Sequence, residues 1–132
     1  MPTTTGSAKA VTLIFPHLKG RLDGLAVRVP VTRGASVLDL VIVTKGQVTK
    51  EQVNTALSIA SEAQPHILGF ETRPLVSTDY VSDNRSGIVD AKSTQVVGSK
   101  LVKIIAFYDN EWGYCCRMVD LATKMIEIGS FN

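Results

Sequence analysis

The sequence predicts an α+β fold, with a mixed and largely antiparallel sheet and helices packed on one of its faces. Three observations lead to this prediction. Segments with the helical spacing of apolar residues alternate with short apolar runs that are typical of strands. Several consecutive strand-like runs are joined by short turns, which favours antiparallel neighbours. The 132 residues, 45% hydrophobic and 20% charged, suit a globular core, so residues 1–132 are expected to form a single domain.

The N-terminal part of the chain predicts one helix and one strand. The helix is expected to begin near Thr5, where threonines offer N-cap oxygens, and to end near Phe15 because Pro16 follows. Its apolar face holds Val11, Ile14, Phe15 and Leu18. The strand is expected over about residues 25–30, with Arg28 on the face opposite its aliphatic residues.

The middle of the chain predicts a strand followed by a second helix. Residues 37–43 are nearly all apolar, as expected of a central strand that is covered on both sides. Thr49-Lys50-Glu51-Gln52 resembles a capping box, and Gln64-Pro65 ends the helix that this box starts. The apolar stripe of this helix consists of Val53, Ala56, Leu57 and Ala60.

The remainder predicts short strands and a last helix. The short strands are expected around residues 67–70, 76–81, 87–92 and 94–97. Residues 101–107 form a longer apolar run, typical of a buried strand. The helix that follows carries apolar residues at i, i+3, i+4, i+7 and i+8, namely Met118, Leu121, Ala122, Met125 and Ile126.

Composition excludes several classes of function. The net charge is +2 and the basic residues are scattered among acidic ones, so nucleic-acid binding is not expected. No apolar run approaches the roughly 20 residues that span a bilayer, so no membrane partner and a cytoplasmic location are expected. Cys115 and Cys116 are sequence neighbours, which matches no metal-ligand spacing, and no metal site is expected.

The most informative segment joins the buried strand to the last helix. It reads Tyr108-Asp109-Asn110-Glu111-Trp112-Gly113-Tyr114 and places an amide, acids and an indole at one junction. A side-chain amide at the carboxyl end of a strand is well placed to bond a ligand carboxamide, because ligands in α/β folds favour such crevices. Asn110 as a turn former and Trp112 as a core residue remain the alternative interpretation.

Arg28, Thr5 and Gly6 are candidate anion ligands. A guanidinium on a strand binds phosphate oxygens bidentately from a fixed position, and a helix N-terminus offers unpaired amides and a partial positive charge. The residues alone favour the plainer interpretation, in which Arg28 is a surface or ion-pair residue and Thr5 with Gly6 is a simple N-cap.

Six segments together resemble the C-terminal part of the catalytic domain of phosphorylating glyceraldehyde-3-phosphate dehydrogenase. They occur in the family's order and spacing: residues 3–11, 18–22, 26–30, 36–40, 76–80 and the segment 108–114. The resemblance covers nearly the whole chain. It implies an N-terminally truncated form of that family's α+β C-terminal domain, in an oxidoreductase that forms a thioester by hydride transfer and releases it by phosphorolysis.

The resemblance also implies roles for particular residues. Arg28, Thr5 and Gly6 correspond to ligands of the substrate phosphate or of inorganic phosphate. Asn110 corresponds to the amide that orients the nicotinamide of NAD or NADP, and Tyr114 to the aromatic residue that packs beside it. The implied partners are glyceraldehyde 3-phosphate, inorganic phosphate and sister subunits of a homotetramer, or the missing N-terminal half.

Parts of that enzyme are not found in the sequence. There is no Gly-x-Gly-x-x-Gly fingerprint, so the dinucleotide-binding domain is expected to be absent. The family's Ser-Cys-Thr-Thr-Asn context is also missing, so Cys115 and Cys116 are not taken as the nucleophile. His17 and His66, which each follow a proline, are interpreted as solvated histidines.

Two functions therefore stay open at this point. In the first, the chain is part of the dehydrogenase, contains no catalytic cysteine or histidine and is inactive alone. In the second, it is a noncatalytic interaction or oligomerisation module that uses apolar surface once covered by the missing half and by sister subunits.

Overall fold

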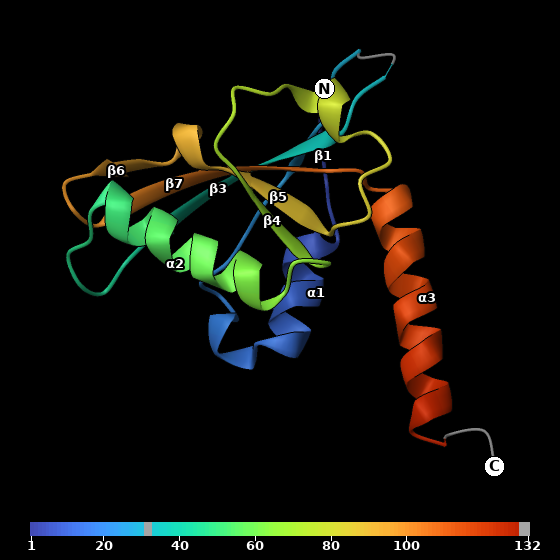
Figure 1. The fold of residues 1–132 in the computed structure, drawn as a ribbon. Coiled ribbons are helices and arrows are strands. Elements are labelled where there is room, and N and C mark those ends of the chain that lie inside the picture. Colours follow the sequence, from blue (N-terminus) through green and yellow to red (C-terminus); the bar gives the residue numbers. More distant parts are fainter. Residues whose placement is uncertain (31–32, 130–132) are drawn as a thin grey trace. The chain divides into compact units, whose positions relative to one another are not determined.

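The computed structural model describes residues 1–30 and 33–129 (Figure 1). The chain divides into two compact units, residues 1–32 and residues 33–132. Helices and a mixed sheet occur together, which confirms the predicted α+β class. The prediction that residues 1–132 form a single domain stays a prediction.

The first unit contains a two-stranded ladder and a short helix. Strands β1 (Pro2–Thr3) and β2 (Ala26–Val27) pair antiparallel, with Pro2 opposite Val27. Helix α1 (Ser7–Ile14) ends at Phe15, because the backbone leaves the helical region there and Pro16 starts a separate 3₁₀ turn. The predicted helix is confirmed, whereas the predicted strand is paired only over Ala26–Val27.

The second unit is built on a five-stranded sheet with the order β3-β7-β5-β4, and β6 also pairs with β7 (Figure 1). These strands are β3 (Ser36–Val43), β4 (Leu68–Glu71), β5 (Gly87–Asp90), β6 (Gln95–Val97) and β7 (Leu101–Tyr108). The β4–β5 pair is parallel and the other pairs are antiparallel. The sheet is therefore mixed and largely antiparallel, as predicted.

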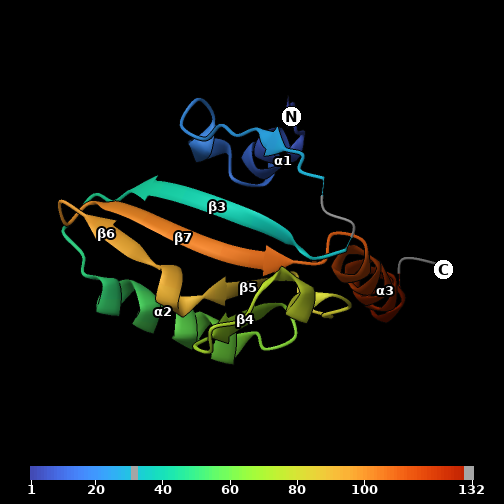
Figure 2. The same ribbon diagram turned by 90° about the horizontal axis from the view of Figure 1, so that it is seen from above.

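Helix α2 (Lys50–Ala63) lies along one face of this sheet (Figure 2). The predicted capping box is present, since Thr49 Oγ1 accepts from the amide of Gln52 and Gln52 Oε1 accepts from the amide of Thr49. Beneath the helix lies the hydrophobic core, which consists of Val89, Val102 and Ile104 with Leu40, Val48, Val53, Leu57, Leu68, Phe70 and Val96 around them. Burial of these side chains holds the helix to the sheet.

Two predictions about strands are wrong. Residues 37–43 were predicted to form a central strand, but β3 lies at the edge of the sheet, and Val41 and Val43 are 55% and 76% exposed. An apolar run shows that a strand has two apolar faces and does not reveal what covers each face. Residues 76–81 were predicted to be a strand, but Ser77–Tyr80 form a 3₁₀ turn because the Asp79 carboxylate accepts from the amide of Val76.

Helix α3 (Trp112–Glu127) begins where β7 ends and extends beyond the end of the sheet (Figures 1 and 2). Its predicted apolar stripe is largely exposed: Met118 is 51% exposed and Leu121 is 56% exposed. Within the described ranges, no helix is long and apolar enough to cross a membrane.

Candidate functional site

The turn between β7 and α3 is fixed by one carboxylate. Asp109 Oδ1 accepts from the amides of Glu111 at 3.2 Å and Trp112 at 2.8 Å, and Asp109 Oδ2 accepts from the amide of Ser82 at 2.8 Å. The amide of Gly113 donates to the carbonyl of Asp109. These hydrogen bonds, first that from Ser82, lower the pKa of Asp109. Asp109 therefore caps α3 and ties the turn to the 82–86 loop.

Two predicted cofactor residues meet at this turn. Asn110 and Tyr114 both line an open hollow of about 240 Å³. Its other walls are Ser86, Tyr108, Asp109, Gly113 and Arg117. Tyr114 is 64% exposed, so its ring is open to contact. The hollow is smaller than the roughly 300–1,000 Å³ of a drug-sized ligand pocket, so it suits one ring of a larger ligand.

The amide of Asn110 is held on one side only. Ser36 Oγ, at the start of β3, donates to Asn110 Oδ1 at 2.9 Å. The Nδ2 group of Asn110 has no hydrogen-bond partner among residues 1–30 and 33–129. Asn110 is exposed, and an Nδ2 donor without a described partner beside an exposed ring fits a ligand that carries both a carbonyl and an aromatic ring.

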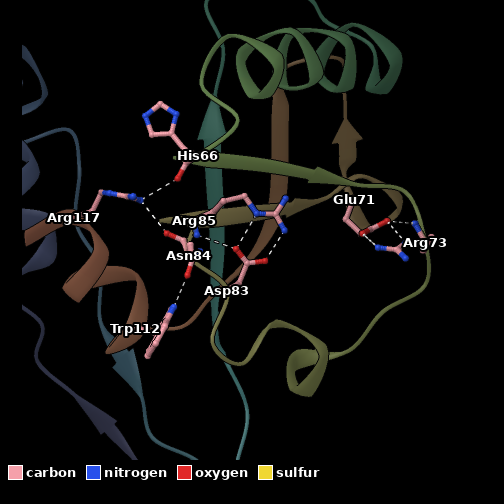
Figure 3. A network of polar contacts seen from close by, with 8 residues as sticks. All are labelled: His66, Glu71, Arg73, Asp83, Asn84, Arg85, Trp112 and Arg117. Atoms are coloured by element: carbon pink, nitrogen blue, oxygen red, sulfur yellow. Dashed lines mark hydrogen bonds and ion pairs between the residues drawn. The ribbon is translucent and has the colours of Figure 1, made fainter. Parts of the chain in front are cut away.

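Arg117 on the first turns of α3 fastens the helix to the neighbouring loop (Figure 3). Its Nη1 group donates to the carbonyls of His66 and Asn84, both at 3.2 Å, and to Ser86 Oγ at 3.0 Å. Its Nε and Nη2 groups contact Asp120 at 2.8 and 2.7 Å. One guanidinium thus joins α3 to the β4 and β5 region.

Trp112 and Gly113 complete this contact. Trp112 Nε1 donates to Asn84 Oδ1 at 2.6 Å, and its side chain is half exposed, so it is not a core residue (Figure 3). Gly113 is buried, and a Cβ there would lie 3.0 Å from the carbonyl oxygen of Arg85. Glycine at this position therefore permits the close approach of helix and loop.

A second ion pair shapes the same loop. Arg85 Nε and Nη2 donate to the two carboxylate oxygens of Asp83 at 2.9 and 2.6 Å (Figure 3). The hydrogen bonds from Arg85 lower the pKa of Asp83, and its partial burial opposes this shift. The Arg85 guanidinium lies against Gly69 of β4, where a Cβ would collide with it. The space that Gly69 leaves therefore accommodates the pair.

The candidate anion residues lie in the first unit. Thr5 Oγ1 accepts from the amide of Ser7 at 3.2 Å and donates to Ser7 Oγ at 3.0 Å, and Gly6 is the N-cap of α1. Thr5 lines an open hollow of about 480 Å³ whose walls include Lys9 and Asp23. Thr5 and Gly6 thus lie together at a helix start, with one cation and one carboxylate nearby.

Arg28 lies elsewhere in this unit. Its amide donates to the carbonyl of Met1 at 2.9 Å, and the Met1 ammonium donates to the carbonyl of Arg28. This places Arg28 beyond Pro2 and Val27 at the end of the ladder opposite to Thr5. Its exposed guanidinium forms no ion pair with another described residue. The structure therefore groups Thr5 with Gly6 but not with Arg28.

Neither cysteine lies in a catalytic arrangement. Cys115 is exposed, and Cys116 Sγ lies 3.7 Å from Asn84 Oδ1. His17 packs edge-on against Phe15 at 6.2 Å, and His66 contributes its backbone carbonyl to Arg117. Over the described part of the chain, no group of three His, Cys, Asp or Glu residues is placed to hold a metal.

Comparison with known proteins identifies the family. Residues 1–110 match the family model described as "Glyceraldehyde 3-phosphate dehydrogenase, C-terminal domain". The chain belongs to this family. Among similar proteins, glyceraldehyde-3-phosphate dehydrogenase 3 of Nostoc sp. is 56% identical over 127 residues, which are 95% of this chain and 37% of the relative. Glyceraldehyde-3-phosphate dehydrogenase 2 of Bacillus subtilis is 50% identical over 122 residues, 92% of this chain and 36% of the relative.

The enzyme of Geobacillus stearothermophilus, glyceraldehyde-3-phosphate dehydrogenase, is 49% identical over 130 residues, which cover 98% of this chain and 38% of that enzyme. The chain therefore spans little more than a third of the length of these dehydrogenases. The predicted family membership is confirmed. The match to the glyceraldehyde 3-phosphate dehydrogenase C-terminal domain ends at residue 110, just before α3 begins at Trp112.

Several residues of this dehydrogenase-family site were not found from the sequence. Asp109 lies two residues before Glu111, the N-cap of α3, and an acidic residue close to a helix start is a signal that a sequence can show. Ser36 lies 74 residues from Asn110, and Arg117 lies 33 residues from Asn84, so no local pattern links them. Only the pairing of Ser36 with Tyr108 at the end of the β3–β7 ladder brings the first two together.

Proposed function

We propose that this chain supplies the nicotinamide-orienting and phosphate-binding residues of a phosphorylating glyceraldehyde-3-phosphate dehydrogenase. The reaction is the NAD- or NADP-dependent oxidation of an aldehyde to an acyl phosphate. The observation that carries the proposal is the hollow at the start of α3, where Asn110 and Tyr114 lie together and the Asn110 Nδ2 donor has no hydrogen-bond partner among the described residues.

Asn110 and Tyr114 are proposed to hold the nicotinamide end of the cofactor. The cofactor, when bound, accepts the hydride. With the cofactor bound, Asn110 Nδ2 would donate a hydrogen bond to the carboxamide, and the ring of Tyr114, which is exposed, would pack beside the pyridine. Asp109 holds the backbone under both side chains by binding the amides of Glu111 and Trp112. The role of these residues is to fix which face of the nicotinamide meets the substrate.

Thr5, Gly6 and Arg28 are proposed to bind the phosphate of glyceraldehyde 3-phosphate or inorganic phosphate. The backbone amides in the first turn of α1 have no carbonyl partner within the helix, and the positive end of the helix dipole lies there. The guanidinium of Arg28 is exposed and is free of an ion pair within the described residues, so it is available for bidentate contact with an anion. Thr5 and Gly6 lie at one end of the β1–β2 ladder and Arg28 lies at the other. This separation favours two points of contact with phosphate over one compact site.

A chimeric enzyme tests this function. Residues 1–132 replace the matching segment of the Nostoc sp. relative, with which they are 56% identical. The chimera is expected to reduce NAD with glyceraldehyde 3-phosphate in a phosphate-dependent manner. Arg28→Ala is expected to raise the KM for phosphate about tenfold or more, because a charge-assisted hydrogen bond contributes about 1.5–3 kcal/mol.

Arg21→Ala is the matched control, since Arg21 is an exposed arginine of the same unit. A folded chimera without dehydrogenase activity contradicts the proposal. Equal kinetic parameters for Arg28→Ala and Arg21→Ala contradict the phosphate role of Arg28.

The exposed sheet face favours a second proposal, association with copies of the same chain or with a full-length relative. On β3, Val37, Val41 and Val43 are 53%, 55% and 76% exposed, and the pair Asp39–Lys103 at 2.9 Å is the charged part of this face. Apolar surface of this kind favours association. Val41→Lys is expected to lower the sedimentation coefficient of the purified chain. If the unchanged chain and Val41→Lys both sediment as monomers, this proposal is contradicted.

A further inference from the structure

Within residues 1–30 and 33–129, the Ser36 side chain makes the one hydrogen bond to the Asn110 side-chain amide. Ser36 Oγ donates to Asn110 Oδ1 at 2.9 Å, across 74 residues of sequence. An asparagine amide has two chemically opposite ends, an acceptor oxygen and a two-proton donor. With Oδ1 bound by the hydroxyl, Nδ2 has no hydrogen-bond partner among the described residues, and Asn110 lines the hollow that it shares with Tyr114.

Both partners are held by their own backbones. Ser36 is the first residue of β3 and pairs with Tyr108 of β7, and the amide of Ala35 donates to the carbonyl of Ser77 at 3.0 Å. Asn110 follows Asp109, whose carboxylate binds three backbone amides. Since neither main chain is free to shift, the side-chain hydrogen bond requires little additional ordering.

We propose that Ser36 is a positioning residue that holds the Asn110 amide through Oδ1, so that Nδ2 is the end left for the ligand. This inference rests on the proposed function for its consequence, because Nδ2 is a donor and matches the carbonyl oxygen of a carboxamide. Oδ1 in that place would instead demand the NH₂ group of the carboxamide. Because a serine hydroxyl both donates and accepts, ligands that distinguish the two ends of the amide test this orientation.

The first test measures the pairing itself on the 132-residue chain labelled with ¹⁵N. Side-chain relaxation of the Asn110 NH₂ group reports its motion on the ps–ns timescale. We expect a restrained amide in the unchanged chain, loss of that restraint in Ser36→Ala, and retention in Ser36→Thr, which keeps the hydroxyl. An Asn110 amide that moves equally in all three chains overturns the inference.

The second test measures the consequence in the Nostoc sp. chimera with NAD and with the 3-acetylpyridine analogue of NAD. The analogue keeps the carbonyl and lacks the NH₂ group. With Ser36 in place, Asn110 needs only the carbonyl, so both cofactors gain this contact. In Ser36→Ala the Asn110 amide is free to rotate, so that Oδ1 can also meet the ligand. Oδ1 can accept from the NH₂ group of NAD but has no partner on the analogue, so we expect the KM of the analogue to rise about threefold more than the KM of NAD. A purely structural role of Ser36 moves both values together.

The variant Asn110→Ala separates the two claims. If Asn110→Ala leaves the cofactor KM and kcat unchanged while relaxation still shows the Ser36 pairing, the proposed nicotinamide role is wrong. If Asn110→Ala lowers activity and Ser36→Ala leaves the ratio between NAD and its analogue unchanged, the Ser36 inference is overturned and the proposed function stands.

Discussion

Asp109 contributes to the site through the backbone, because its carboxylate accepts from two amides at the start of α3, those of Glu111 and Trp112, and from the amide of Ser82. Asp109 lies two residues before Glu111, the N-cap of α3, but it binds the first amides of the helix as a capping side chain does, and loss of such a cap costs about 0.5–2 kcal/mol of folding free energy. We therefore expect Asp109→Ala to lower the free energy of unfolding by about 1 kcal/mol, measured by urea denaturation. Asp109→Asn, which keeps one acceptor oxygen, should lose less. An unchanged midpoint for Asp109→Ala contradicts the capping role.

The Asp83–Arg85 pair makes stability depend on pH. Hydrogen bonds from Arg85 lower the pKa of Asp83 below its ordinary value of 3.8 in the folded chain. The stabilisation is therefore fully present above pH 3.8 and is lost as the pH falls through the lower folded pKa. We expect Asp83→Asn to flatten the decline of unfolding free energy below pH 4. If the unfolding free energy of Asp83→Asn falls below pH 4 with the same slope as that of the unchanged chain, the Asp83–Arg85 pair makes no such contribution.

At the residue scale, the sequence predicts what is encoded locally. Asn110 and Tyr114 were singled out from one motif of seven residues, and the structure places them on one hollow. Ser36 and Arg117 were not singled out, because their partners lie 74 and 33 residues away and depend on strand register and helix docking. Arg28 and Thr5 were both singled out as phosphate ligands, and the register of the ladder places them at opposite ends of it.

At the element scale, α3 is attached to the rest of its unit mainly through polar contacts near its start. Arg117 donates to the carbonyls of His66 and Asn84 and to Ser86 Oγ, with 26% of its side chain exposed. We expect Arg117→Ala to destabilise the attachment by about 1–2 kcal/mol, since hydrogen bonds from charged groups exceed neutral ones and partial exposure reduces them. Amide hydrogen exchange of residues 112–120 should accelerate.

Two further variants serve as controls for this prediction. Arg117→Lys keeps the charge but not the planar fork, so it should recover only part of the protection. Lys124→Ala changes an exposed cation on the same helix and should leave exchange unaltered. Exchange rates that are equal in Arg117→Ala and Lys124→Ala contradict the attachment.

Elements differ in how far their sequence determines them. The capping box at Thr49 and Gln52 starts α2 as predicted, because its two hydrogen bonds lie within four residues. The position of β3 at the sheet edge follows from pairing with β7 alone, which an apolar run does not reveal. Residues 77–80 turn instead of extending because one carboxylate, that of Asp79, binds the backbone.

At the scale of the whole molecule, the chain spans 37% of its Nostoc sp. relative and contains no Ser-Cys-Thr-Thr-Asn sequence. Its two cysteines lie on α3 without a histidine partner in the described structure. We therefore expect purified chain to give no NAD reduction with glyceraldehyde 3-phosphate and phosphate. If the purified chain reduces NAD and Arg28→Ala abolishes this activity, the expectation is contradicted. If the rate of NAD reduction is the same in Arg28→Ala, the activity comes from contaminating host enzyme.

The most direct test of the central claim is the effect of Asn110→Ala on kcat/KM for NAD in the Nostoc sp. chimera, with Tyr114→Phe as the control. Asn110→Ala removes the Nδ2 donor of a residue that lines the hollow, and we expect kcat/KM to fall about tenfold. Tyr114→Phe keeps the ring that packs beside the nicotinamide and should stay near the unchanged value. An Asn110→Ala chimera as active as the parent contradicts the claim that this hollow receives the nicotinamide.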